Sequence, residues 1–247
     1  MRPEICNISE RLYVLEQMFI KMGGDRDFLN DVVLLGTKFQ FYDVLTSRAV
    51  EFIISEFNRG VGANSNVAGM EFNDGDCIID IGGNIGTVSM YLAKKHPNIK
   101  IYAYEPTKRN YENFLKNIKL NNIPDGIITL FNKAVTKDSR DVHISTMLQN
   151  SGGSNIFTPK STSDTSGGDV PSTTLDKIFE ENNINKCALL KIDCEGAEYE
   201  ILYNTKEQHL RKCACILGEL HGQHGDVEAL EKYVSQYISK SYWDKHP

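Results

Sequence analysis

Short runs of apolar residues alternate with segments of helical periodicity from residue 76 onward, and this alternation constrains the fold more than any other feature. The runs predicted as strands are CIIDIG (77–82), IKIYAYEP (99–106), IITLFNKAV (127–135), ALLKID (188–193) and ACILGEL (214–220). Helical segments follow each of these runs except the third. Continuous apolar strands suit a sheet that is buried on both faces, so the pattern predicts an α/β protein with a doubly wound, mostly parallel sheet and helices on both faces.

The pattern also divides the chain into two parts. Residues 1–70 are predicted to be a helical N-terminal extension that packs on the core, with an extended piece at KFQFYDV (38–44). Its helical segments are ISERLYVLEQMFIKM (8–22) and SRAVEFIISEF (47–57). Residues 71–247 form the α/β domain, with a flexible polar loop at about 149–169. A polar loop of this length is either a functional lid or disordered.

The composition argues against several classes of protein. The formal net charge of −6 argues against a general nucleic-acid-binding surface. No apolar stretch approaches the roughly 18–20 residues of a membrane span, and the N-terminus lacks the basic start and apolar core of a secretory signal. The six cysteines form no C-x-x-C pair, which is typical of reduced thiols. We therefore expect a cytoplasmic protein without a membrane span or a nucleic-acid partner.

The segment IIDIGGNIGTVSMYLA (78–93) joins the first strand of this domain to its first helix through a glycine-rich turn. Glycines let the backbone approach a ligand closely, and the helix N-terminus aims its amides at that ligand. Glu105 stands 25 residues after Asp80, at the end of the second strand, where a carboxylate can accept both hydroxyls of a ribose. These features predict a Rossmann-like site for a nucleoside cofactor, NAD included.

The glycine spacing distinguishes between nucleoside cofactors. The dinucleotide fingerprint G-x-G-x-x-G needs its middle glycine so that the backbone can touch the pyrophosphate. Aligned from Gly82, that middle position holds Asn84, and the alignment that ends on Gly86 places Ile81 at the first glycine. Neither register matches, so an NAD-binding oxidoreductase is the weaker alternative.

Motifs that occur in order along the domain resemble those of a known family. They are DIGGNIG (80–86), EP (105–106), TLD (174–176) and KIDCEGAE (191–198). Together they resemble the FkbM family of class I S-adenosylmethionine-dependent methyltransferases, over residues 75–222. The resemblance implies the class I methyltransferase fold, S-adenosylmethionine as methyl donor, and an acceptor hydroxyl on a sugar, polyketide or other secondary metabolite.

Residues at the ends of the first three strands are the cofactor candidates. In the family that this chain resembles, the acid at the place of Asp80 helps to order the methionyl end of the cofactor. The segment Asn132–Ala134 ends the third strand, where such folds usually line the adenine. The predicted cofactor-binding residues are Asp80, Gly82, Gly83, Asn84, Gly86, Glu105, Asn132 and Ala134.

The ends of the fourth and fifth strands carry the catalytic candidates. Asp193 ends the fourth strand, and Glu219 and His221 end the fifth, so all three should converge on the cofactor site. An alcohol is a poor nucleophile at neutral pH, so a base or a metal must assist. Asp193 or His221 is the predicted general base, with Glu195 either capping a helix or meeting substrate. Alternatively, Asp193, Glu219 and His221 bind Mg²⁺ or Mn²⁺.

Several further charged residues are predicted to be structural. Lys191 lies inside an apolar strand and needs an acidic partner. The dipole of a helix N-terminus is sufficient to explain Glu198. The remaining histidines show no pairing pattern and are predicted to lie at the surface: His96, His143, His209, His224 and His246.

The predicted function is O-methylation of a carbohydrate-type acceptor, such as a nucleotide-activated sugar or a surface glycan precursor, with S-adenosylmethionine as cofactor. N-methylation of a peptide or small molecule is the alternative within the same class. From other classes, the alternatives are an NAD-binding oxidoreductase and a non-catalytic partner subunit. The joint presence of Asp80, Glu105, Asp193 and Glu195 argues against loss of catalysis.

Overall fold

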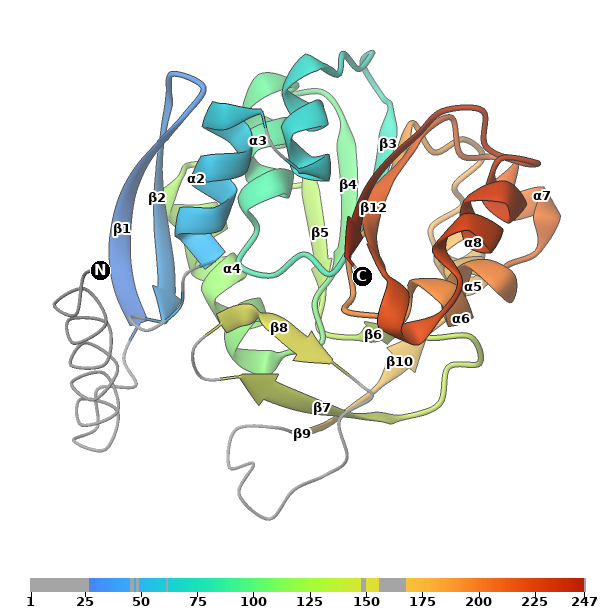
Figure 1. Ribbon diagram of the computed structural model, residues 1–247. Coiled ribbons are helices and arrows are strands. Elements are labelled where there is room, and N and C mark those ends of the chain that lie inside the picture. The colour runs from blue at the N-terminus through green and yellow to red at the C-terminus, as the bar shows by residue number, and fades with distance from the viewer. Residues whose placement is uncertain are drawn as a thin grey trace, which may run out of the picture.

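A parallel sheet forms the centre of the protein. The computed structural model describes residues 27–44, 47, 49–60, 62–147, 150–155 and 168–246. Within them, a six-stranded sheet has the order β13-β12-β11-β3-β4-β5, and every neighbouring pair is parallel (Figure 1). Its strands are β3 (Cys77–Ile81), β4 (Lys100–Tyr104), β5 (Ile128–Phe131), β11 (Leu189–Ile192), β12 (Ile216–His221) and β13 (Ser241–His246).

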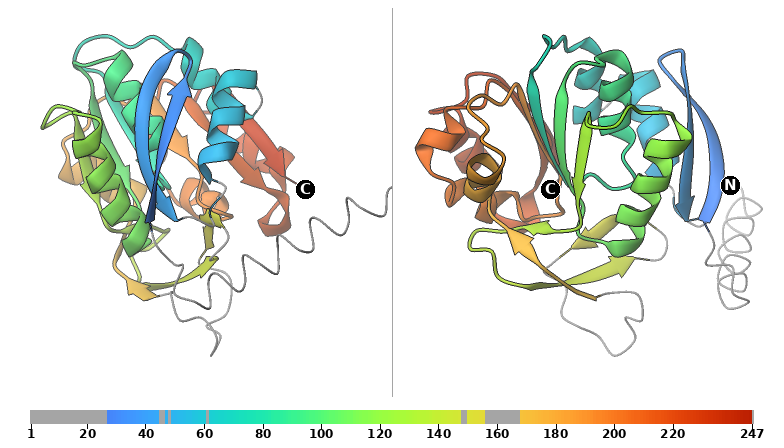
Figure 2. Two further views of the ribbon diagram at one scale, coloured as in Figure 1. Left: turned by 90° about the vertical axis from the view of Figure 1, so that its left-hand side faces the viewer. Right: turned by 180° about the vertical axis from the view of Figure 1, so that it is seen from behind.

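Helices cover both faces of this sheet (Figure 2). One face packs against α2 (Ala49–Arg59), the 3₁₀ helix η1 (Ala63–Gly69), α3 (Thr87–Lys95) and α4 (Lys108–Leu120). The other packs against α5 (Leu175–Glu181), α6 (Glu198–Tyr203), α7 (Glu207–Leu210) and α8 (Val227–Val234). Ile78 belongs to the first apolar cluster and its neighbour Ile79 to the second, which explains why the strands are apolar at successive positions. The predicted doubly wound, Rossmann-like sheet is confirmed.

The register of the strands brings charged residues together. Lys191 lies opposite Asp80 in the pairing of β11 with β3. In the pairing of β12 with β13, Glu219 lies opposite Asp244 and His221 opposite His246. Paired residues on neighbouring strands have adjacent side chains, so the sheet itself places these groups in contact distance.

The N-terminal extension differs from the helical prediction. Residues 27–44 form an antiparallel hairpin of β1 (Asp27–Leu34) and β2 (Thr37–Val44), which includes the predicted extended piece at 38–44. The predicted helix at 47–57 overlaps α2, whereas the one at 8–22 lies outside the described residues. The helical interpretation fails for β1 because its buried residues, Val32 and Leu34, follow a period of two.

Asparagines of α4 fasten the hairpin to the domain. The side chain of Asn117 accepts the backbone N–H of Tyr42 at 2.7 Å and donates to its carbonyl at 3.1 Å. Asn121 does the same for Gln40, at 3.0 and 2.6 Å. The backbone groups on the outer edge of β2 therefore have side-chain partners, although none of the described strands adjoins that edge.

Short strands adjoin the cavity at the carboxyl ends of the central sheet, below it in Figure 1. The run IITLFNKAV splits into β5 and β6 (Ala134–Val135), and β6 pairs with β10 (Ser172–Thr173). A second small sheet consists of β7 (Val142–Met147), β8 (Asn150–Asn155) and β9 (Gly168–Val170). The predicted flexible loop thus contains β8 and the start of β9, and its residues 156–167 lie outside the described part of the chain.

Candidate active site

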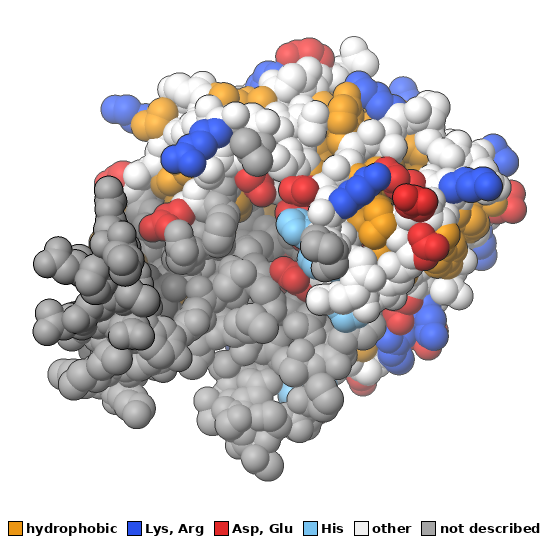
Figure 3. Space-filling view, in the orientation of Figure 1, with side chains coloured by type: hydrophobic (Ala, Val, Ile, Leu, Met, Phe, Trp, Pro, Cys, Tyr) orange, Lys and Arg blue, Asp and Glu red, His pale blue; other side chains and the backbone are white. Residues whose placement is uncertain are grey.

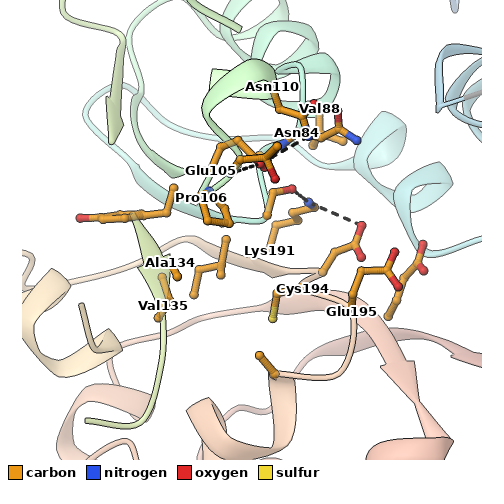
Figure 4. A pocket seen from close by; sticks show the side chains of 18 of the residues that line it. Asn84, Val88, Glu105, Pro106, Asn110, Ala134, Val135, Lys191, Cys194 and Glu195 are labelled. Carbon is orange, nitrogen blue, oxygen red and sulfur yellow. Dashed lines mark hydrogen bonds and ion pairs between the residues drawn. The ribbon is translucent and has the colours of Figure 1, made fainter. Parts of the chain in front are cut away.

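A cavity of about 330 Å³ opens at the carboxyl ends of the central strands. One half is bordered by the glycine turn, Glu105 and the segment around Ala134. The other half contains acidic side chains and a histidine: Glu56, Asp193, Glu195, Glu219 and His246. In the close view of Figure 4, Asn84 and Glu105 lie on one side of Lys191, and Glu195 lies on the other. Figure 3 shows acidic and histidine side chains together near the centre of one molecular face.

The glycine turn presses its backbone against the end of β11. Gly82 has φ 79°, and an added Cβ would lie 1.8 Å from the carbonyl oxygen of Asp193. Gly86 has φ 93°, and a Cβ there would lie 2.2 Å from the ring of Phe114. Only glycine tolerates both the left-handed backbone and these close approaches. The turn therefore packs closely through its backbone, and its residues Gly82, Gly83 and Asn84 line the cavity.

Glu105 is a buried carboxylate at the cavity wall, with 4% of its surface exposed. One oxygen accepts the backbone N–H of Asn84 at 2.8 Å, and the other accepts that of Thr107 at 2.9 Å. Burial raises the pKa of Glu105 to about 7, against the opposing effect of these donors. Oε1 also accepts from Asn110 Nδ2 at 3.4 Å, so Oε2 is the oxygen with a second lone pair for a hydroxyl group of a ligand.

Lys191 connects the two halves of the cavity. Its Nζ donates to the carbonyl of Gly82 at 2.7 Å and lies 3.3 Å from Asp80 Oδ1 and 3.7 Å from Asp193 Oδ2. Burial favours the neutral amine, but Asp80 and Asp193 outweigh it and keep the pKa of Lys191 above its ordinary value. The predicted acidic partner of this buried lysine is thus present twice. Asp80 itself, also bonded to Ser89 at 2.6 Å, stands behind the cavity wall.

His221 and Glu195 form a pair at the end of β12. His221 Nε2 lies 3.4 Å from Glu195 Oε2, and Nδ1 lies 3.5 Å from Glu198 Oε1. Burial opposes the charged ring, but Glu198, Glu195 and Asp193 outweigh it and raise the pKa of His221 to about 9. His221 therefore carries a proton at neutral pH and is not a free base. Glu198 is fully buried and accepts the N–H of Cys194 at 2.8 Å, so it holds this ring as well as the loop.

Glu195 extends into the cavity from a strained backbone. Its φ of 55° lies in the left-handed region, which is costly for a residue with a Cβ. Burial and then the charge of Asp193 raise the pKa of Glu195 to about 7, while His221 acts in the opposite direction. A carboxylate with a pKa near neutrality can both take up and release a proton under physiological conditions.

Residues 80–241 match the family described as the methyltransferase FkbM domain. This chain belongs to the FkbM family of methyltransferases. It is therefore a methyltransferase of the FkbM type that uses S-adenosylmethionine, and not an NAD-binding oxidoreductase.

Individual proteins similar to this chain share a low sequence identity with it. "Methyltransferase 1" of Beauveria bassiana is 26% identical over 172 residues, which cover 63% of this chain and 68% of that protein. "31-O-demethyl-FK506 methyltransferase FkbM" of Streptomyces tacrolimicus is 22% identical over 193 residues, covering 66% and 73%. A crystal structure of methyltransferase FkbM from Methylobacillus flagellatus aligns with a TM-score of 0.48 at 14% identity, over 77% of this chain. This chain spans 47% of that protein's length.

Some predicted cofactor residues of this FkbM-type protein support the cavity from behind instead of lining it. Gly82, Gly83, Asn84, Glu105 and Ala134 line it; Asp80, Gly86 and Asn132 do not. Asn132 donates to the carbonyls of Glu105 and Pro106, both at 2.9 Å, and so holds the loop that carries Glu105. Lys133 and Val135 line the cavity beside Ala134, although sequence reasoning left Val135 out.

The group of residues with metal-ligand spacing differs from the predicted set of metal ligands in this FkbM-type protein. Among the described residues, the group whose ligand atoms all lie within 4.8 Å is Glu219, Asp244 and His246. His246 Nε2 lies 3.1 Å from Glu219 Oε2. Of the predicted set of Asp193, Glu219 and His221, only Glu219 belongs to this group. The charge of Asp193, followed by burial, raises the pKa of Glu219 to about 9.

The histidines predicted to lie at the surface have partners, of which those of His246, His209 and His143 are the most informative. His246 lines the cavity beside Glu219, a position that follows from the parallel pairing of β13 with β12 and not from any local motif. His209 is buried, bonds to Asp176 at 2.5 Å and stacks on Phe179 with ring centroids 5.1 Å apart. The acid of the T-L-D motif therefore joins α5 to α7. His143 pairs with Asp169 at 2.8 Å.

Glu56 is a further functional candidate that sequence reasoning missed. It lies on α2, outside the matched domain, and lines the cavity facing the acidic residues of the sheet. Burial, then the charges of Asp193 and Asp244, raise the pKa of Glu56. The available signal was an acid one helical turn after Ile53, on the side of the helix that also carries buried Phe57.

Proposed function

We propose that this FkbM-type protein methylates a hydroxyl group of a carbohydrate-type acceptor and that Glu195 takes up the proton of that hydroxyl. The observation that carries the proposal is the position of Glu195, which enters the cavity beside the glycine turn and is backed by His221. A nucleotide-activated sugar or a surface glycan precursor is the proposed acceptor.

The half of the cavity that is bordered by the glycine turn, Glu105 and the segment around Ala134, here called the cofactor half, fits S-adenosylmethionine. When bound, this cofactor supplies an electrophilic methyl group on a sulfonium. Glu105 would hold the ribose, the backbone of Gly82 and Gly83 would face the methionyl part, and Ala134 and Val135 offer apolar contact to the adenine. The glycines let the turn pack against Asp193 and Phe114, and this packing places the backbone of the turn at the cavity wall.

Glu195 is preferred as base over the other predicted candidates. His221 already holds a proton at neutral pH, and Asp193 is tied to Lys191 at 3.7 Å. The pKa of Glu195 is about 7, close to neutrality, whereas that of His221 is about 9. His221, 3.4 Å away, orients the Glu195 carboxylate and favours its ionised form before it accepts the hydroxyl proton.

The other half of the cavity, which contains the acidic side chains and His246, is here called the acceptor half. Its chemistry supports a polyhydroxylated acceptor. Its carboxyl groups on Glu56, Asp193, Glu195 and Glu219 accept hydrogen bonds in their ionised form, which suits a ligand rich in O–H donors. The name of the Streptomyces tacrolimicus relative refers to a 31-O-demethyl substrate, which supports transfer to oxygen. N-methylation remains the alternative within the class.

A divalent metal is the second candidate for assisting the hydroxyl. If one participates, Glu219, Asp244 and His246 provide the ligand set with the required spacing. With Glu195 as base, we expect turnover to be unchanged after dialysis against a chelator. Loss of turnover that Mg²⁺ or Mn²⁺ restores would assign the metal mechanism instead, and the same experiment on His246→Ala would locate the ion.

The direct test is transfer of a deuterated methyl group from labelled S-adenosylmethionine to a panel of nucleotide sugars, methyl glycosides, amino sugars and short peptides. We expect one labelled methyl on a sugar oxygen, located by tandem mass spectrometry. Exclusive labelling of nitrogen, or of no sugar in the panel, contradicts the proposal.

The proposed location is the cytoplasm. Support comes from the cysteines, because Cys77, Cys187, Cys194, Cys213 and Cys215 are all free thiols. Separately, none of the helices within the described ranges combines the length and the apolar character that crossing a bilayer requires.

A further inference from the structure

Part of the acceptor half comes from outside the family domain. The FkbM match begins at residue 80, yet Ile53 and Glu56 of α2 and Asn64 of η1 line the same cavity. Both α2 and η1 belong to the N-terminal region and pack on the same face of the central sheet as α3 and α4. The cofactor half therefore lies within the matched domain, whereas this part of the acceptor half does not.

Glu56 and Asn64 form a built polar pair. Asn64 Nδ2 donates to Glu56 Oε2 at 2.8 Å, and Asn64 has only 6% of its surface exposed. In its ionised form the Glu56 carboxylate only accepts hydrogen bonds, so the amide nitrogen faces it and the amide oxygen points elsewhere. That oxygen, Oδ1, is buried and has no hydrogen-bond partner among the described residues.

The backbone next to this pair leaves space for the carboxylates. Gly62 has φ 82°, and an added Cβ would lie 3.1 Å from Glu56 Oε1 and 3.2 Å from Asp244 Oδ2. These two oxygens therefore converge on a position that has no side chain. Asn64 Oδ1 is therefore an acceptor that no described residue uses, on a side chain that lines the cavity beside the Glu56 carboxylate.

We propose that Glu56 and Asn64 form the specificity-determining subsite for the acceptor and bind a second hydroxyl group, separate from the one that is methylated. The inference rests on the proposed function, because it takes the acceptor to be polyhydroxylated. The subsite consists of acceptor atoms, so it selects for O–H donors and against an acceptor that lacks a hydroxyl at that position.

The experiment compares methyl glycosides of hexoses with their mono-deoxy and amino-deoxy analogues. Binding to protein loaded with S-adenosylhomocysteine is measured by calorimetry, and methyl transfer is measured with S-adenosylmethionine. In the unaltered protein we expect one deoxy position to lower affinity and kcat/KM by about 10- to 100-fold. In Glu56→Ala we expect the parent sugar to fall to the level of that deoxy analogue, which itself stays unchanged.

Glu56→Gln distinguishes a hydroxyl from an ammonium group, which offers the same donors. The glutamine oxygen would accept from Asn64, so its NH₂ would face the ligand, and only a hydroxyl can accept from that NH₂. We expect Glu56→Gln to retain the hydroxyl-bearing sugar better than Glu56→Ala does. Glu51→Gln, the same change at an exposed position of α2, is the matched control and should leave every ratio unchanged.

Unchanged S-adenosylhomocysteine affinity shows that each variant is folded. If the ratio of parent to deoxy sugar is the same in Glu56→Ala as in the unaltered protein, or if no polyol binds, the subsite is wrong. Preference for the amino-deoxy analogue, abolished by Glu56→Gln, overturns the hydroxyl assignment. Polyol binding that depends on Glu56 without any methyl transfer leaves the subsite standing and contradicts the proposed function.

Discussion

The two halves of the cavity are built in different ways. In the cofactor half, the carboxylate of Glu105 has backbone donors from Asn84 and Thr107, and the turn that faces it is bare backbone. In the acceptor half, carboxylates from β11, β12 and α2 face one another, and mutual repulsion contributes to the raised pKa of Glu56, Glu195 and Glu219. In the cofactor half, hydrogen bonds fix the position of the carboxylate. In the acceptor half, neighbouring carboxylates repel one another, and binding of a proton or of a substrate donor can reduce this repulsion.

Glu195→Gln tests the acceptor half most directly. We expect kcat to fall by about 10²- to 10⁴-fold, because the amide cannot take up the hydroxyl proton. Calorimetry should show unchanged binding of S-adenosylhomocysteine, since Glu195 lies outside the cofactor half. Near-normal turnover would transfer the role of base to another residue, with Asp193→Asn as the next variant.

Lys191→Met tests whether the connection between the halves is structural. The change leaves Asp80 buried without its cation, and breaking such a buried pair costs about 3–5 kcal/mol of unfolding free energy. Urea denaturation at neutral pH measures the loss. Lys206→Met, which breaks an exposed pair with Glu180, is the control and should change stability by less than about 1 kcal/mol. Equal effects of the two would show that Lys191 is not a structural connection.

Glu105→Ala probes the cofactor half alone. Removal of a charge-assisted acceptor should weaken S-adenosylhomocysteine binding by about 10- to 100-fold, because such hydrogen bonds contribute roughly 1.5–3 kcal/mol. Turnover at saturating cofactor should fall much less. A loss confined to kcat, with unchanged affinity for S-adenosylhomocysteine, would show that Glu105 acts in the transfer step and not in binding the cofactor.

The pH dependence of kcat/KM has the smallest expected effect. The pKa of Glu195 is about 7, raised from its ordinary value, so its base form is lost as pH falls through 7. We expect an acidic limb that declines about tenfold per pH unit below this value. The limb should be absent from the residual activity of Glu195→Gln. An acidic limb near pH 4 would show that a carboxyl group with an ordinary pKa limits the reaction.

The cofactor half was predictable because each of its parts follows a strand in the sequence. The glycine turn comes directly after β3 and Glu105 directly after β4, so local pattern and the rule for parallel strand ends were sufficient. Even there, local reasoning did not separate residues that line the cavity from those behind it. Asp80 and Asn132 look like contacts in the sequence but bond to Lys191 and to the Glu105 loop.

By itself, the sequence determined the parallel α/β sheet, the cofactor class and the positions of Asp193 and Glu195, because these depend on periodicity and on short motifs. Only the tertiary structure decided that Glu56 and His246 join the acceptor half and that the N-terminal strands form a hairpin. Glu56 reaches the cavity through the packing of α2, and His246 through its register with β12. Contacts between segments far apart in the chain leave no short-range pattern, because they arise only when the core closes.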